Sequence, residues 1–213
     1  MRVLAFLLAL ATFSGCDIER REFYVRTGMS EGKLVAGIGM PISEMRKRST
    51  FEIEKTATSD VGDVTATIVA VFDFELAGTG LRIPRCGGYW IDSTKSGVIE
   101  AIQIYPSVTK LTRGEVEAAN RQIEQRLFAD GWSKGHLSGD SIEPLGNDSR
   151  TFWRRNDLFI ILHTKERDGR WLQDLNVHAW ESDEIYKGHV EFPQRGSVVR
   201  PAGFEPAAFS SGG

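Results

Sequence analysis

The fold is decided by residues 151–179, TFWRRNDLFIILHTKERDGRWLQDLNVHA. The dipeptide Asp168-Gly169 lies between two apolar stretches there and is a strong signal for a two-residue β-hairpin turn. A turn at this point makes one face of the hairpin apolar, because it pairs Leu162 with Leu175, Ile160 with Val177 and Leu158 with Ala179.

A weaker turn signal, Asn156-Asp157, precedes this hairpin. A turn there brings Trp153 beside Ile160 and Thr151 beside Leu162. The sequence therefore predicts a three-stranded antiparallel meander with a filled inner face, which we expect to lie under a helix.

The opposite face of the meander is unusually apolar. Its expected rows are Arg150–His163–Asp174, Phe152–Ile161–Asn176 and Arg154–Phe159–His178. The large apolar side chains among them are not expected to face water. Either the N-terminal strands or a partner protein covers this face, and we favour packing by the N-terminal strands.

The clearest helix begins near Thr112, which forms a capping-box pattern with Glu115. Apolar residues then recur at helical spacing along one face, namely Val116, Ala119, Ile123 and Leu127. Gly131 supplies the end of the helix.

The N-terminal half contains a short helix and several strand-like segments. Ser43 is the expected N-cap of a helix that runs to about Arg48. Strand-like patterns follow at residues 51–55, 64–76, 81–91 and 98–105.

The predicted fold class is α+β, with antiparallel sheet of about seven strands packed by one long and one short helix. The domain is expected to span residues 33–194, and its halves, 33–106 and 107–194, are candidates for two α-β-β-β repeats. Residues 195–213 lack periodicity and are predicted to be a disordered tail.

Residues 1–16, MRVLAFLLALATFSGC, have the features of a secretion signal. Arg2 precedes an apolar segment that is too short for a membrane span of about 20 residues but suits a signal peptide. The ending Phe13-Ser14-Gly15-Cys16 resembles a bacterial lipobox, although Phe13 stands where leucine is usual. The resemblance implies a signal peptide at 1–15 and lipidation of Cys16.

A lipid on Cys16 implies anchoring to the cell membrane or the outer membrane, at a periplasmic or other extracytoplasmic face. Asp17 resembles the inner-membrane retention signal of enteric bacteria, but other lineages use this position differently, and both membranes stay open. Residues 16–32 are expected to be a short tether.

Residues Gly39-Met40-Pro41-Ile42-Ser43-Glu44-Met45 resemble a phrase common in small bacterial lipoproteins. On this basis the chain is similar to the fold of the β-lactamase inhibitor protein and of small outer-membrane assembly lipoproteins. The glycine-x-proline that usually closes that helix is replaced here by Arg48-Ser49-Thr50.

Candidates for catalysis are few. His163 opposite Asp174 is expected to be a cross-strand polar pair, and no nucleophile accompanies it. Residues 28–32 match G-x-S-x-G, but Lys33-Leu34-Val35 has an extended pattern, which does not suit a nucleophile elbow. Arg85 beside Cys86 would lower the pKa of the thiol, but we favour a small, half-buried residue at a strand bulge. Most of the tryptophans are expected in the core.

Two functions follow from different classes. The first is a membrane-anchored, non-catalytic envelope lipoprotein that binds another protein as an assembly accessory, an inhibitor or an immunity factor. The alternative is a lipid-anchored periplasmic hydrolase with dispersed catalytic residues. No metal site or cofactor is expected, and the net charge of −3 argues against nucleic acid.

Overall fold

The computed structural model describes residues 18–53, 57–58, 62–67, 70–137, 148–182 and 189–193. The helical elements are α2 (Ile42–Arg48), α3 (Arg113–Ala129), the 3-10 turn η1 (Trp180–Ser182) and residues 18–27. The strands are β1 (Lys33–Ala36), β2 (Ala57–Thr58), β3 (Gly62–Thr67), β4 (Phe72–Leu76), β5 (Arg82–Cys86), β6 (Gly88–Thr94), β7 (Ile99–Tyr105), β8 (Ser133–Leu137), β9 (Ser149–Arg155), β10 (Leu158–Arg167), β11 (Arg170–Ala179) and β12 (Val190–Glu191).

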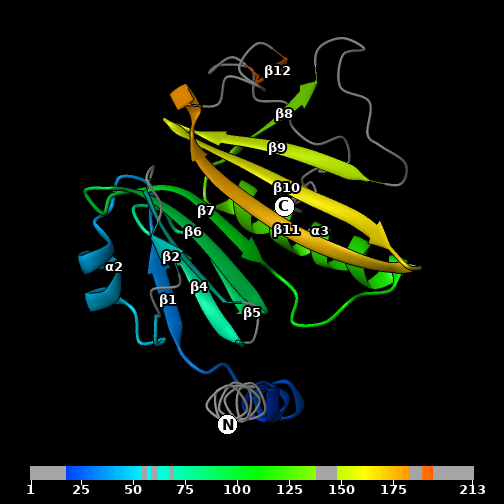
Figure 1. The fold of residues 1–213 in the computed structure, drawn as a ribbon. Coiled ribbons are helices and arrows are strands. Elements are labelled where there is room, and N and C mark those ends of the chain that lie inside the picture. Colours follow the sequence, from blue (N-terminus) through cyan, green and yellow to red (C-terminus); the bar gives the residue numbers. More distant parts are fainter. Residues whose placement is uncertain are drawn as a thin grey trace, which may run out of the picture.

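The strands form two sheets, and the predicted α+β class with mostly antiparallel pairing is confirmed. Nine strands form the large sheet in the order β12-β8-β9-β10-β11-β7-β6-β3-β2, and β1-β4-β5 form a small one. The pair β1–β4 is parallel. The expected number of about seven strands is not confirmed, since the described residues contain twelve. Figure 1 shows β9, β10 and β11 side by side, with α3 against them.

The meander has the predicted register. Strand β10 pairs with β11 so that Leu162 faces Leu175, and with β9 so that Ile160 faces Trp153. Both turn residues that the sequence marked, Asn156 and Asp168, adopt positive φ angles. The inner face of the meander is buried together with Ile123 and Leu127 of α3, as expected.

The small sheet covers the same face of the large sheet at the other strands, β6 and β7. Side chains of β1, β4 and β5 share one buried cluster with those of β6 and β7, including Leu34, Phe74, Ile83, Ile91 and Ile102. The large sheet is thus covered on one face by α3 and by the small sheet, which lie over different halves of it.

The other face of the meander is covered within the chain, but not by the N-terminal strands as expected. Those strands join β11 edge to edge through β7, so they extend the sheet and do not stack on it. The cover consists of Trp180, Val190 and Phe192, which pack with Phe152, Phe159 and Ile161.

Gly135 of β8 makes room for this cover. A Cβ atom at this position would lie 2.6 Å from the Phe192 ring and 2.7 Å from Val190. Only glycine allows the C-terminal segment to approach the strand so closely.

The two helix starts differ in how they are capped. Thr112 and Glu115 form the predicted capping box at the start of α3. Helix α2 ends at Arg48 as expected, but its N-cap is Pro41 and not Ser43. The chain enters α2 earlier because Pro41 bridges to Val98, and the Ile42 amide donates to the Gly97 carbonyl.

Three strand predictions need correction. The segment expected at residues 81–91 is divided between β5 of the small sheet and β6 of the large sheet. The segment expected as one strand at residues 64–76 is divided between β3 and β4, which belong to different sheets. Residues 51–53 form no strand. Both helices precede antiparallel strands, but β4 and β5 interrupt the first series, so the two repeats are not confirmed.

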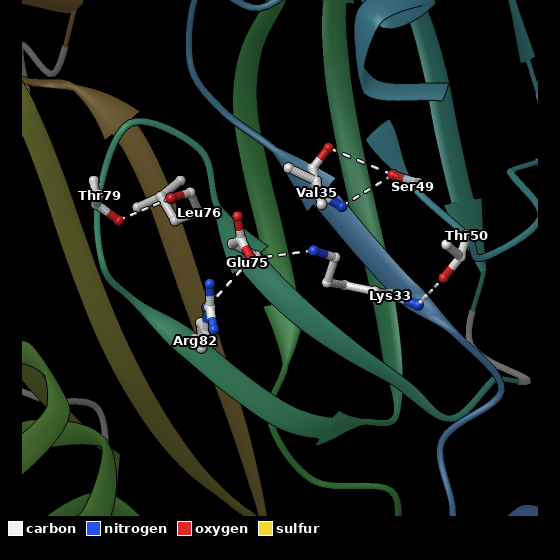
Figure 2. Close-up of polar contacts among 8 residues, drawn as sticks. All are labelled: Lys33, Val35, Ser49, Thr50, Glu75, Leu76, Thr79 and Arg82. Atoms are coloured by element: carbon white, nitrogen blue, oxygen red, sulfur yellow. Dashed lines mark hydrogen bonds and ion pairs between the residues drawn. The ribbon is translucent and has the colours of Figure 1, made fainter. Parts of the chain in front are cut away.

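The exposed edge of β1 is closed by side chains (Figure 2). The Ser49 hydroxyl accepts from the Val35 amide at 2.9 Å, and the Thr50 hydroxyl accepts from the Lys33 amide at 2.9 Å. On the surface of this sheet, the Glu75 carboxylate lies 3.3 Å from the Lys33 ammonium and 3.2 Å from the Arg82 guanidinium. The two hydroxyl contacts satisfy backbone amides of β1 that would otherwise attract another strand.

Candidate functional site

Two rows of side chains cross the outer face of the large sheet. Strand pairing places Ala66, Trp90, Gln103 and Asn176 in one row. It places Val64, Asp92, Ala101 and His178 in the other. We call these eight residues the open face, because each is at least partly exposed.

Trp90 is the most exposed member of the open face. Its neighbours in β6, Tyr89 and Ile91, point into the core, so alternation directs Trp90 outward. The residue is 45% exposed, and its indole Nε1 donates to Asp92 Oδ1 at 2.8 Å. This hydrogen bond orients the ring and leaves its apolar surface available for contact.

The same rows continue into the covered part of the sheet. Asn176 pairs with Ile161, and His178 pairs with Phe159. The open face therefore adjoins the buried aromatic cluster directly, and both belong to a single sheet surface.

Ionisable side chains gather at the end of this surface. His163 and Asp174 are neighbours across β10 and β11, as predicted, and both are nearly buried. Asp174 accepts from Asn176 at 2.6 Å and lies 3.2 Å from the Lys165 ammonium. His163 lies 3.9 Å from Asp174 through Nδ1 and 3.6 Å from Asp148 through Nε2.

Burial is the largest cause of the pKa shifts of His163 and of the nearby Tyr105. It lowers the pKa of His163 below its usual value, while the Asp174 carboxylate opposes the shift and Lys165 reinforces it. Burial also raises the pKa of Tyr105, with a smaller contribution from Asp174. His163 is therefore a neutral imidazole at pH 7, in a site where charge is costly.

Among the described residues, none is placed as an activated nucleophile for His163. Neither carboxylate is within hydrogen-bonding distance of the ring. The hydroxyls of Ser149 and Thr164 belong to the inner face, since alternation separates them from His163. The arrangement buries polar groups and does not resemble a relay between acid, base and nucleophile.

The inner face has its own recess, about 450 Å³ in volume, between α3 and the meander. Its lining includes Asn120, Thr164 and Trp171, with Glu117 and Glu166 at the polar side. The Asn120 amide donates to the Thr164 hydroxyl at 3.1 Å and its carbonyl accepts from Gln173. These polar groups satisfy one another except for Gln173 Oε1, which is buried without a hydrogen-bond partner among the described residues.

Two other sequence candidates have structural roles. Cys86 ends β5 beside the irregular β4–β5 register, as expected, but it is fully buried and not half-buried. Burial raises the pKa of its thiol, so the alternative of a pKa lowered by Arg85 is wrong. In the G-x-S-x-G match, the Ser30 hydroxyl donates to Asp73 at 2.6 Å, and Lys33–Val35 belong to β1 as expected. Neither residue is presented as a nucleophile.

The signal peptide at 1–15, the lipidation site Cys16 and the tail at 195–213 lie outside the described residues. Within the described ranges no group of three or more His, Cys, Asp or Glu side chains is placed to hold a metal ion. The same part of the chain contains no helix long and apolar enough to cross a membrane.

Sequence reasoning did not single out Trp90. Trp132, Trp153 and Trp180 are buried, in line with the expected core positions, whereas Trp171 is half-buried and Trp90 is exposed. The alternation Tyr89-Trp90-Ile91 within β6 was the available signal, but it does not reveal which face is covered. Comparisons with known protein families, curated proteins and solved structures find no match.

Proposed function

We propose that the protein is a lipid-anchored envelope lipoprotein that acts as a non-catalytic binding module, and that its open face binds another protein. Each of the three roles that the sequence suggests, assembly accessory, inhibitor and immunity factor, would use such a binding surface. The observation that carries the proposal is the exposure of Trp90 on an otherwise regular sheet surface.

The composition of the open face supports a protein partner. Its eight residues include one carboxylate, one histidine and no lysine, arginine or glutamate. Long charged side chains are depleted at the centre of protein interfaces, and tryptophan is enriched among the residues that contribute most to affinity. The small side chains of Ala66 and Ala101 leave the Trp90 ring standing above its neighbours.

The expected occupant is a protein surface with an apolar centre and a hydrogen-bonding rim. The apolar centre would pack on Trp90, while Gln103 and Asn176 offer amide donors and acceptors. A basic side chain of the partner would meet Asp92, whose Oδ1 already holds the indole.

The strand order supports the prediction that the two halves are repeats. The strands are arranged as β3-β6-β7 followed by β11-β10-β9, so the last long strand of each half meets the other in the middle. We infer that the halves are two α-β-β-β repeats and that β4 and β5 are an insertion in the first. The open face and the covered aromatic face would then be corresponding surfaces.

Lipid anchoring is tested by Cys16→Ala in the full chain. We expect loss of fatty-acid labelling and release from the membrane fraction. Unchanged labelling of the Cys16→Ala protein would contradict the lipidation proposal.

The binding surface is tested by a photo-crosslinking amino acid at Gln103 in intact envelopes. We expect a discrete adduct that falls at least about tenfold when Trp90→Ala is added, because truncating a hot-spot aromatic costs about 2 kcal/mol or more of binding energy and about 1.4 kcal/mol is a tenfold change. Phe128→Ala is the matched control, since Phe128 is a 57% exposed aromatic on α3. An adduct that is equally sensitive to both substitutions would contradict the proposal.

A further inference from the structure

A pocket of about 390 Å³ lies where the chain leaves the end of β7. Its lining includes Tyr105 of β7, the loop at residues 107–110, and Leu172 and Gln173 of β11. By alternation, the side chains of Tyr105 and Leu172 lie on the same side of the large sheet as the open face.

The backbone of Gln173 points toward this loop. Trp171, two residues earlier in β11, exchanges two backbone hydrogen bonds with Leu111, at 2.8 and 3.0 Å. Backbone groups of alternate residues in an antiparallel strand point to the same side, so Gln173 directs its N–H and C=O that way as well. Gln173 is only 2% exposed, so these groups have little access to bulk water.

Pro106 removes the partner that Gln173 would otherwise have. The register of β7 with β11 pairs Ile104 with Leu175 and would next bring residue 106 opposite Gln173. Proline has no N–H to donate, and the pairing stops here. Among the described residues, none forms a backbone hydrogen bond with Gln173 from this loop. Since buried backbone groups are almost always paired, this pair is available to an external group.

The loop itself is held by three contacts. A Cβ atom at Gly87 would lie 2.7 Å from the Val108 Cα, so only glycine allows the loop to pack this closely on the sheet. The Ser107 hydroxyl accepts from the Thr109 amide at 3.3 Å. Arg21 donates to the Val108 carbonyl. The pocket therefore does not require a ligand to form it.

Arg21 belongs to a helix at residues 18–27, where the sequence predicted part of a tether. The Arg85 guanidinium holds the end of this helix, since it lies 3.4 Å from the Val25 carbonyl and 3.5 Å from the Met29 carbonyl. The N-terminal segment is thus fixed beside the pocket and supplies one of its basic groups.

The charge of the pocket lining is positive. Arg21 and Lys110 are basic, and the described lining includes no carboxylate. The carboxylate of the adjacent Asp174 is already engaged, at 3.2 Å from the Lys165 ammonium and 2.6 Å from the Asn176 amide. The lining therefore favours a ligand with a negative charge.

The two ends of the gap in the sheet are closed. Leu111 occupies the edge of β11 at Trp171, and Ile104 occupies it at Leu175. These positions are four residues apart, which is about 14 Å along the strand. A strand of another protein cannot run through this gap, so a peptide that pairs with Gln173 has to end there.

We propose that this pocket binds the C-terminal residue of a peptide. The N–H of that residue would donate to the Gln173 C=O, and its carboxylate would accept from the Gln173 N–H and from Lys110. Val108 and Leu172 would contact an apolar last side chain. Capture of a terminal carboxylate by backbone groups is a recurring mode of peptide recognition. The site does not involve Trp90, so it stands whether or not the open face binds a partner.

The test is a titration of the full-length protein in detergent micelles, followed through its backbone amide signals by NMR. The probes are acetyl-Ala-Ala-Leu with a free carboxylate and the same peptide with a C-terminal amide. The free acid should shift the Gln173 amide signal and bind at least about tenfold more tightly than the amide, because charge-assisted hydrogen bonds are the stronger ones.

Lys110→Glu should weaken binding of the free acid about tenfold by reversing the charge beside its carboxylate. Lys95→Glu is the matched control, because Lys95 is also exposed and lies before the start of β7, at its other end. Leu172→Glu should also weaken binding, and folding should tolerate it because Leu172 is 36% exposed.

Equal affinity for the acid and the amide, or a Gln173 signal that neither peptide moves, would overturn the inference. An equal loss of binding in Lys110→Glu and Lys95→Glu would also contradict it, because the effect would then come from net charge. If acetate shifts the Gln173 signal as strongly as the free acid, the pocket holds an adventitious ion only, and the proposal is wrong.

Discussion

The outer face of the large sheet has two regions that share the same rows of residues but differ in their surroundings. On one side of β11, Phe159 and Ile161 are buried under Trp180, Val190 and Phe192. On the other side the rows continue as the open face, where Trp90 is 45% exposed. A single sheet surface is thus core in one half and available for contact in the other.

The comparison shows that burial of this sheet surface depends on whether the C-terminal residues Trp180, Val190 and Phe192 pack over it. The cover is dense with aromatic contacts, since Trp180 lies edge-on to Phe159 at 5.0 Å and to Phe192 at 5.4 Å. The Arg154 guanidinium lies 4.7 Å from the Trp180 ring centroid. Trp90 instead has a hydrogen bond to its own strand neighbour, Asp92, which keeps its ring in place without a cover.

The largest expected effect is a difference in the free energy of unfolding between alanine substitutions in the two regions. Phe159→Ala removes a fully buried ring and should lower the free energy of unfolding by about 3–5 kcal/mol. Trp90→Ala should change it by no more than about 0.5 kcal/mol. Urea unfolding measures both, and a comparable loss in the two variants would mean that the open face is also core.

A second substitution tests how closely the cover packs on β8. Gly135→Ala places a Cβ atom against Phe192 and Val190 and should cost about 1–3 kcal/mol through overpacking. Gly114→Ala in α3 meets no atom within 4 Å and should stabilise the protein by about 0.5–1 kcal/mol. Opposite signs in thermal unfolding are the expected result, and two neutral changes would argue against a close-packed cover.

A third substitution tests the layer beneath the covered region. Thr112→Ala removes the capping hydroxyl of α3 and should cost about 1 kcal/mol. Ser43→Ala is the control, because no side chain caps α2 and Ser43 is exposed. Chemical denaturation should show a loss for Thr112→Ala alone, and an equal loss for Ser43→Ala would contradict the observed helix start.

The smallest expected effect lies at the border between the regions. The folded pKa of His163 is lowered from its ordinary value of 6.5, so the unfolded chain binds more protons as the pH falls below that value. This histidine should therefore make the protein less stable on acidification and contribute nothing above the ordinary pKa.

His163→Gln should flatten the pH dependence of the unfolding free energy below about pH 6.5. His136→Gln, at a side chain that is 71% exposed, is the control substitution. If the unfolding free energy changes equally with pH in His163→Gln and in the unsubstituted protein, His163 does not cause the loss of stability in acid.

The sequence predicted those parts of the fold that local chemistry determines. The dipeptide Asp168-Gly169 and the flanking apolar alternation were sufficient for the register of β10 and β11, because turn geometry fixes which residues pair. The Thr112–Glu115 box was sufficient for the start of α3, because its hydrogen bonds join residues only three apart in the sequence.

The features that were missed depend on distant packing. Residues 64–76 look like one strand, yet β3 joins the large sheet and β4 pairs in parallel with β1, which no local pattern specifies. The docked helix at 18–27 depends on Arg85, nearly sixty residues away along the chain. Trp90 could be placed on the outer face by alternation, but its exposure depends on where the C-terminal segment crosses the sheet.

The central claim is that the open face is occupied by a protein partner in the envelope. Hydroxyl-radical footprinting with mass spectrometry tests it by comparing intact envelopes with the purified lipidated protein. We predict that oxidation of Trp90 falls several-fold in envelopes while oxidation of Phe128 is unchanged. Equal oxidation of Trp90 in the two samples would contradict the account.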